Sequence, residues 1–208
     1  MTQPFTLRTA GPRALLVQFE TAQLVRDYYS EACHQRAMGS LSPKMEFVPA
    51  ARTILFDGVD EPVALARALR AWRPEAHTAT ATRNIEVPTR YDGPDLEEVA
   101  ETWKMRMADV IELHAGLVHV VAFHGFAPGF AYLSGIPEDL TVPRRSSPRP
   151  QVPAGSVALA GFFTGVYPRA SPGGWQLIGH TDVPLWDENA DPTAYLLPGD
   201  RVRFVPLP

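Results

Sequence analysis

Residues 117–133, with the sequence LVHVVAFHGFAPGFAYL, decide the fold of the C-terminal half of the chain. The run Leu117–Phe123 is rich in β-branched and aromatic residues, as expected for a strand, and Gly125 and Gly129 then break it. Further short β-like runs follow, separated by Pro- and Gly-rich loops, at Val157–Gly161, Gly174–Ile178 and Arg201–Val205. Short strands spaced in this way are typical of a β-barrel or β-sandwich.

The two halves of the chain differ in their proline and glycine content and in the secondary structure they predict. Residues 123–208 hold 13 of the 21 prolines and 10 of the 15 glycines. Residues 1–90 instead alternate strands with two helices, one from an N-cap at Thr21 to near Gly39 and one opened by Pro62 and continuing to Trp72. The expected strands are Thr6–Thr9, Ala14–Phe19, Phe47–Val48, Arg52–Phe56 and Asn84–Pro88. This order predicts a small α+β sandwich in which both helices cover one face of a mainly antiparallel sheet.

A helical bridge is expected between the two halves. Gly93-Pro94-Asp95 breaks the chain and is interpreted as the cap of a helix with Glu97 and Glu98 in its first turn, and a second short helix is expected at Ala108–His114. The predicted organisation is therefore an α+β domain at 1–90, a bridge at 91–116 and a β-barrel domain at 117–208.

Composition excludes several classes of protein. A net charge of −4 over 208 residues argues against a nucleic-acid partner, which would favour a dominant basic face. The longest apolar stretch, Gly116–Phe123, is too short to span a bilayer, so no membrane partner is expected, and Met1–Pro4 does not resemble a secretion leader. The only cysteine, Cys33, is interpreted as a small core residue and fits a cytoplasmic location.

Familiar catalytic motifs are absent from the sequence. It contains no GxxxxGK[ST] or GxGxxG loop, no GxSxG elbow, and no HExxH or HxH pair among its six histidines, so no metal site is expected. Ser156 is interpreted as a turn residue in preference to a nucleophile. His114 is expected at the end of a helix, and His119, between Val118 and Val120, is expected to face outward or toward an interface with another protein chain.

Two adjacent segments carry the chemistry that remains. Gly-Phe-x-Pro-Gly-Phe at residues 125–130 combines permissive backbone with large rings, which suits a cleft lined by main-chain N–H groups; a tight turn with buried aromatics is the alternative. Arg144, Arg145 and Arg149 are held by prolines in an interval, between Asp139 and Asp182, that contains no acidic residue. Guanidinium groups bind carboxylate or phosphate in bidentate fashion, although a solvated basic loop fits the same pattern.

Together with two more Gly-rich turns, these segments predict an anion-binding groove with aromatic walls. The arginines are its candidate catalytic residues. The candidate groove residues are Phe126, Pro128, Gly129, Phe130, Val152, Pro153, Gly155, Ser156, Tyr167, Gly173, Gly174, Trp175 and His180.

The same motifs closely resemble the 5-oxoprolinase B-subunit family, also labelled allophanate hydrolase subunit 1 and sporulation-kinase inhibitor. The resemblance rests on GFAPGF at 125–130, PRR at 143–145, VPAGSV at 152–157, TGVYP at 164–168, SPGGWQLIG at 171–179 and PGDRVRF at 198–204. Weaker likeness at GPRALLV (11–17) and VPAAR (48–52) extends it over the whole chain. It implies an α+β N-terminal domain followed by an all-β cyclophilin-like barrel.

The resemblance also implies an activity and partners. It implies a hydrolase component that opens 5-oxo-L-proline to L-glutamate with hydrolysis of ATP and Mg²⁺ in an assembled complex, no cofactor being held by this chain alone. The implied partners are a larger carboxyltransferase-like protein, the 5-oxoprolinase C-subunit or allophanate hydrolase subunit 2, and a third protein, the A-subunit. Alternatives are a component that hydrolyses another amide, a regulator that inhibits a histidine kinase, and, from the implied fold alone, a prolyl isomerase.

Two positions depart from the family pattern. His124 stands where an aliphatic residue is common, and His180 follows Gly179 where Arg or Lys is usual, so ligand affinity there is expected to depend on pH. The amidase label fits less well than the lactamase one, because an amidase needs a Ser-Ser-Lys set and neither Lys44 nor Lys104 lies in a Gly/Ser-rich loop.

Overall fold

The structure is a computed structural model that describes residues 4–74 and 83–208. His77 and the first three residues, on which parts of the sequence interpretation rested, lie outside the described residues. The chain forms two compact units, Met1–Ala81 and Thr82–Pro208, which are described separately.

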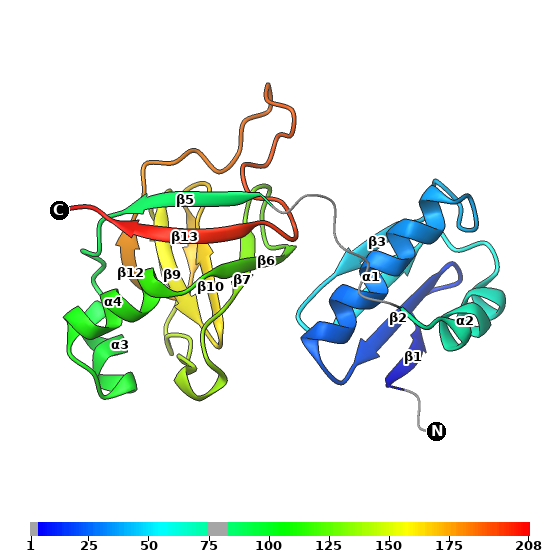
Figure 1. Ribbon diagram of the computed structural model, residues 1–208, viewed down its shortest axis with the longest axis horizontal. Helices are drawn as coiled ribbons and strands as arrows, with labels where there is room; N and C mark the ends of the chain where they lie inside the picture. The colour runs from blue at the N-terminus through cyan, green and yellow to red at the C-terminus, as the bar shows by residue number, and fades with distance from the viewer. Residues whose placement is uncertain (1–3, 75–82) are drawn as a thin grey trace. The chain divides into compact units, whose positions relative to one another are not determined.

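The first unit is an antiparallel four-stranded sheet with two helices, in the order β1-β2-β4-β3 (Figure 1). Its core is built from the alternate residues of the strands and from helix α1: the ring of Tyr28 packs 5.4 Å from Phe5 and 5.0 Å from Phe19. The elements are β1 Phe5–Thr9, β2 Ala14–Phe19, α1 Ala22–Ala37, β3 Glu46–Pro49, β4 Thr53–Asp57 and α2 Pro62–Ala71.

The residues predicted to begin the two helices of this unit do so. The Thr21 hydroxyl accepts a hydrogen bond from the Leu24 N–H and caps α1, and Pro62 occupies the first turn of α2. The interpretation of Cys33 as a core residue was wrong: it is only half-buried, although this burial raises the pKa of its thiol.

The second unit is a seven-stranded mixed sheet in the order β12-β9-β10-β7-β6-β13-β5. Arg90, just after β5, exchanges two backbone hydrogen bonds of 2.8 Å with His180 at the end of β12, and these bonds join the two edges into a nearly closed barrel. The elements are β5 Asn84–Thr89, α3 Leu96–Trp103, α4 Met107–Gly116, β6 His119–His124, β7 Ala131–Ser134, a 3₁₀ turn Glu138–Leu140, β8 Arg149–Val152, β9 Ser156–Ala160, β10 Phe163–Val166, β11 Ser171–Gly173, β12 Gln176–His180 and β13 Arg201–Pro206.

The predicted fold class, an α+β unit followed by a β-barrel, is confirmed. One strand was placed wrongly: β5 does not complete the first sheet but pairs in parallel with β13, from Asn84 opposite Arg201 to Thr89 opposite Pro206. The sequence of β5 does not identify β13 as its partner, because the residue pattern of a strand indicates which side chains are buried and not which strand lies beside it. None of the helices in the described ranges is long and apolar enough to cross a membrane.

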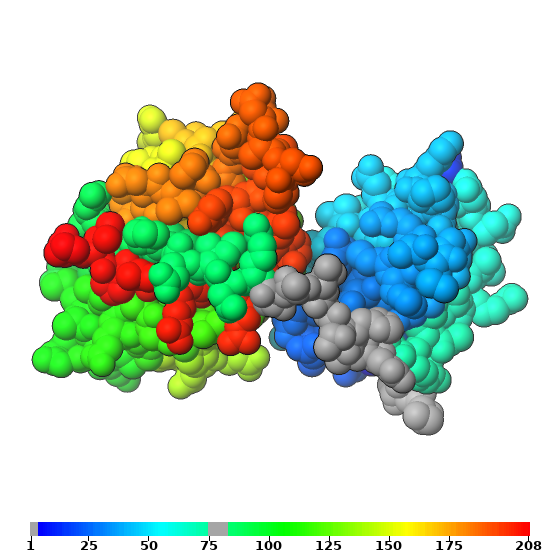
Figure 2. Space-filling model, turned by 45° about the horizontal axis from the view of Figure 1, so that its top comes forward, coloured from blue at the N-terminus to red at the C-terminus, as the bar shows by residue number. Residues whose placement is uncertain are grey.

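Helices α3 and α4 cover part of the barrel and supply core residues, among them Val99 and Val110, neither of which is exposed. Between β12 and β13 the chain makes a long excursion, residues 181–200, which stands out from the barrel in the ribbon and in the space-filling view (Figures 1 and 2).

Candidate functional site

A stack of aromatic rings lies at the centre of the site expected from the sequence. The ring of Phe130 packs edge-on at 5.3 Å from Tyr167 and 5.4 Å from Trp175, and all three side chains are buried. Gly173 makes this packing possible, because a Cβ there would lie 2.2 Å from the Tyr167 hydroxyl. The structure therefore unites residues from 130, 167 and 173–175 in one cluster, with Trp175 as a core residue.

Phe126 differs from the rest of the stack because it is exposed. Its side chain is 61% exposed, although its ring lies 5.3 Å from Phe130 and 6.1 Å from Tyr167. Its backbone has φ of 69°, a left-handed conformation that is strained for a bulky residue and that clusters at functional positions. The fold thus holds an aromatic ring at the surface at a cost in backbone energy.

The loop that carries Phe126 is anchored from one side. Gly129 has φ of 79°, and a Cβ at this position would lie 2.9 Å from the Leu185 carbonyl oxygen. His124 Nε2 is hydrogen-bonded to the Leu196 carbonyl oxygen at 2.7 Å. The excursion 181–200 therefore packs against the loop 125–130 at Gly129 and at the preceding His124, while Pro128 is exposed.

Two of the three candidate arginines are bound to one buried carboxylate. Arg145 Nη1 lies 2.9 Å and Arg149 Nη2 lies 2.6 Å from the same oxygen, Oδ1 of Asp95. The other oxygen of Asp95 accepts a hydrogen bond of 2.7 Å from the Leu177 N–H, and only 3% of this side chain is exposed. Arg145 also lies 3.6 Å from Glu98.

The expectation that no acid neutralises the arginine cluster was therefore wrong. The interval 140–181 contains no Asp or Glu, but the start of α3 supplies Asp95 and Glu98 from far away in the sequence. Asp95 occupies the N-cap position of α3 as predicted, but its side chain makes no capping hydrogen bond and accepts from the arginines instead. The lack of an acidic residue near Arg145 and Arg149 in the sequence was the one signal that their partner, Asp95, lies far away along the chain.

Arg144 differs from its two neighbours. Its side chain is exposed, and within the described ranges it forms no hydrogen bond or ion pair. Burial raises the pKa of Tyr132 and of Tyr167, and the positive charge of Arg144 opposes that rise at both hydroxyls. Arg144 is thus the unpaired cation of the cluster, and its charge acts on the aromatic stack.

The other predicted groove residues form the turn 152–156 and its surroundings. Val152 and Ser156 are buried, Pro153 is exposed, and Gly155 donates a 2.7 Å hydrogen bond to the Tyr167 carbonyl oxygen. Ser156 begins strand β9, as a structural residue would. His180 Nε2 lies 3.1 Å from Asp182 Oδ1, so this imidazole has an acidic neighbour.

Two histidines occupy the barrel core. His114 and His119 are not exposed at all, and their rings lie 4.6 Å apart. His114 is hydrogen-bonded to the Tyr91 hydroxyl at 2.7 Å and to the Thr164 hydroxyl at 3.1 Å. The expectation that His119 faces outward was wrong, since β6 turns His119, Val121 and Phe123 inward.

The environment of this pair keeps both imidazoles neutral. Burial lowers the pKa of His114, with a smaller contribution from His119, and burial lowers the pKa of His119 to about 4. Among the described residues no group of three or more His, Cys, Asp or Glu side chains is placed to hold a metal ion.

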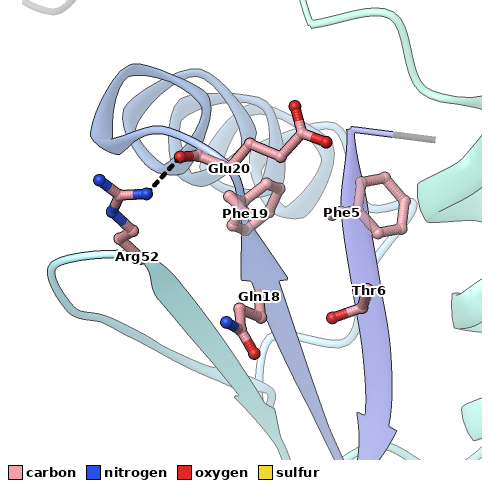
Figure 3. Close-up of a pocket in the computed structure, with 6 residues that line it drawn as sticks. All are labelled: Phe5, Thr6, Gln18, Phe19, Glu20 and Arg52. Atoms are coloured by element: carbon pink, nitrogen blue, oxygen red, sulfur yellow. Dashed lines mark hydrogen bonds between the residues drawn. The ribbon is translucent and has the colours of Figure 1, made fainter. Parts of the chain in front are cut away.

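The first unit carries hollows of its own. One, of about 220 Å³, lies where β1, β2 and the start of β4 meet (Figure 3). Arg52 lines it and donates a 2.6 Å hydrogen bond to the Glu20 carbonyl oxygen, and Phe5 and Phe19 belong to the core beneath it. We assign no chemistry to this hollow, because its cation already has a partner.

Residues 5–196 match the family described as "Carboxyltransferase domain, subdomain C and D". The chain is 49% identical over 146 residues to the 5-oxoprolinase B-subunit of Escherichia coli O157:H7, covering 69% of this chain and 67% of that protein. It is 48% identical over 126 residues to the protein of the same name from Bacillus subtilis strain 168, covering 59% and 52%. The chain thus spans between half and two thirds of the length of these relatives.

Solved structures agree with the fold. The conserved uncharacterized protein PH0987 from Pyrococcus horikoshii is 36% identical with a TM-score of 0.58, and 97% of each chain is covered. TTHA0988 is 34% identical with a TM-score of 0.76, over 94% of this chain and 40% of that one. The urea amidolyase of K. lactis, at 19% identity and a TM-score of 0.77 over 99% of this chain and 15% of that one, shares the fold.

Proposed function

The chain belongs to the 5-oxoprolinase B-subunit family, which carries the carboxyltransferase domain of subdomains C and D, and from this premise we propose that it is the B-subunit of an ATP-dependent 5-oxoprolinase. The proposed reaction adds water across the C–N bond of the lactam ring of 5-oxo-L-proline and gives L-glutamate. ATP, when bound in the assembled complex, would transfer its γ-phosphoryl group to the lactam oxygen and release ADP; this makes the ring carbon a better electrophile, and the phosphoryl group leaves as inorganic phosphate when the ring opens.

The observation that supports a role for this chain is that Phe126 and Arg144 both act on Tyr167: the Phe126 ring lies 6.1 Å from the Tyr167 ring, and the charge of Arg144 opposes the rise that burial causes in the pKa of the Tyr167 hydroxyl. Phe126 presents an exposed ring on a strained backbone, and Arg144 presents a guanidinium with no partner among the described residues. A flat lactam ring packs on an aromatic face, and its carboxylate or the transferred phosphoryl group suits a guanidinium. In this proposal Arg144 contacts substrate, and Arg145 and Arg149 are positioning residues that hold the turn 144–149 through Asp95.

The proposal assigns the nucleotide and its Mg²⁺ to the other proteins of the complex. The described residues show no cluster of acidic or histidine side chains suited to a metal ion, and the sequence has no phosphate-binding loop of the common types. We therefore propose a complex in which a larger carboxyltransferase-like protein, the C-subunit, completes the surface around Phe126 and the A-subunit participates. A cytoplasmic location fits the single cysteine of the chain.

The test is 5-oxoproline-dependent ATP hydrolysis by the chain co-purified with these two partner proteins. We expect stimulation by 5-oxoproline, and its absence would exclude this substrate. Arg144→Ala should lower kcat/KM by about two orders of magnitude, as loss of a charged contact in a transition state does, without a change in folding. Arg169→Ala is the matched control, because Arg169 is an exposed arginine of the same segment; an equal loss in both variants would contradict the role of Arg144.

A further inference from the structure

A groove in the first unit, separate from the site above, is lined by cations. It encloses about 490 Å³ between strand β1, the start of β2 and one face of helix α2, the elements labelled side by side in Figure 1. Leu7 and Leu15 contribute apolar surface from the sheet, and Val63 and Ala66 contribute it from the helix. The groove is shallow and open to solvent.

Three arginines surround this apolar surface, and no acidic residue lines it. They are Arg8 on β1 and Arg67 and Arg70 on α2. Within the described part of the chain none of them forms an ion pair; Arg70 Nη1 donates to the Ala66 carbonyl oxygen at 3.3 Å. Arg67 and Arg70 stand three residues apart and so share a helix face. Three arginines around apolar surface favour a partner that carries both negatively charged and apolar side chains.

The backbone of β1 is available along one side. β1 is the outer strand in the order β1-β2-β4-β3 and pairs only with β2 among the described strands. An edge strand leaves a row of N–H and C=O groups unpaired, and an extended peptide binds such an edge as an additional strand. Val63, 73% exposed at the mouth of the same groove, is apolar surface that such a peptide would cover.

We propose that this groove binds an acidic, extended segment of a partner protein, which pairs with β1 and places its carboxylates near Arg8, Arg67 and Arg70. A second copy of the chain fits less well, because β1, with the sequence FTLRT, would bring one more arginine and no acid. A small anion fits less well too, because it would use the charge but neither the apolar surface nor the strand edge. This proposal does not depend on the 5-oxoprolinase assignment.

The test uses a fluorescein-labelled seven-residue peptide of alternating glutamate and valine, followed by fluorescence anisotropy with the full chain. We expect binding that weakens as salt is raised, and a peptide with lysine in place of glutamate should bind at least about tenfold more weakly. The glutamate peptide N-methylated on alternate residues should also lose binding, because it cannot complete a ladder of hydrogen bonds.

Variants of the chain locate the site. Arg67→Glu and the double variant R67E/R70E should weaken binding progressively, the double variant by at least about tenfold. Arg26→Glu is the control, a reversal on helix α1 of the same unit, and should leave binding unchanged; circular dichroism checks the fold of each variant. Equal binding of the lysine or N-methylated peptide, indifference to R67E/R70E, or displacement by inorganic phosphate at the same charge concentration would overturn the proposal.

Discussion

The two units differ in where they place their charged and polar groups. The barrel buries them: Asp95 and Asp200 are 3% and 4% exposed, and His114 and His119 are not exposed. The described part of the α+β unit buries one charged side chain, Glu31 at 8% exposure, and keeps its ion pair of Arg13 with Asp60 at the surface, where these side chains are 62% and 71% exposed. A buried charge is held only with its partners in place, whereas an exposed charge contributes little to stability and stays available to a ligand.

The largest effect is expected from Asp95→Ala. The change leaves Arg145 and Arg149 without their shared carboxylate and should lower the free energy of unfolding of the barrel by about 3–5 kcal/mol. Urea unfolding followed by hydrogen–deuterium exchange of β9 and β12 measures it separately from the first unit. Asp182→Ala, which removes a carboxylate 72% exposed beside Arg90 and His180, is the control and should cost less than about 1 kcal/mol. Similar costs for the two variants would remove the contrast between buried and exposed charge.

Acidification should weaken the barrel through its histidine pair. Burial lowers the pKa of His119 from 6.5 to about 4, so between these pH values the unfolded chain binds more protons than the folded one. Stability is therefore complete above about pH 6.5 and falls as the pH is lowered toward 4, by about 2 kcal/mol for His119 between pH 7 and pH 5.

The contribution of His119 to this loss of stability can be measured with a variant. His119→Asn removes one titrating group and should reduce the loss between pH 7 and pH 5 by about 2 kcal/mol, whatever its effect at pH 7. Val121→Ala, a change at a buried residue of the same strand that carries no titrating group, should leave the loss between pH 7 and pH 5 unchanged. An identical pH dependence in wild type and His119→Asn would show that His119 does not carry the loss.

A smaller difference should separate Arg145 from Arg144. Arg145→Ala removes one of two guanidinium partners of Asp95 and should cost about 1–3 kcal/mol, since a charged hydrogen bond is lost while Arg149 remains. Arg144→Ala should cost less than about 0.5 kcal/mol, because its side chain is exposed and unpaired within the described residues. Thermal melts of both variants decide, and a larger cost for Arg144 would reverse the assigned roles.

The smallest effect, with the opposite sign, is expected in the first unit. Arg67→Ala relieves repulsion among Arg8, Arg67 and Arg70 and introduces the best helix former, so stability should stay the same or rise by about 0.5 kcal/mol. Chemical denaturation read through exchange of β1 and β2 amides measures it. A clear loss would mean that Arg67 has a structural partner.

The sequence predicted the elements whose signals are local. The run Ala14–Phe19 is rich in strand-forming residues and follows the turn at Gly11-Pro12, α2 is amphipathic behind Pro62, and both elements occur as expected. The four-residue strand β8 contains proline, and the three-residue strand β11 contains proline and glycine; neither was predicted, because they pair with each other and their own composition does not favour a strand.

The misplaced residues have physical causes as well. His119 was assigned to the wrong face because both of its neighbours, Val118 and Val120, are apolar. The alternation of side chains along the strand then does not tell which residues face the core. Of the aromatic stack in the candidate site, Phe126, Phe130, Tyr167 and Trp175 were predicted, whereas Tyr132, whose ring lies 5.1 Å from Phe130 and 5.4 Å from Trp175, was missed. The partner of the arginines was not, since Asp95 lies some 50 positions away from Arg145.

The position of β13 between β5 and β6 has a consequence for biosynthesis. β5 is made before the other barrel strands, yet its neighbour β13 is the last strand of the sheet to be synthesised. Until then β5 and β6 present unpaired edges to the cell, while every strand of the α+β unit has already left the ribosome. We therefore expect the barrel to complete its sheet after the α+β unit has folded.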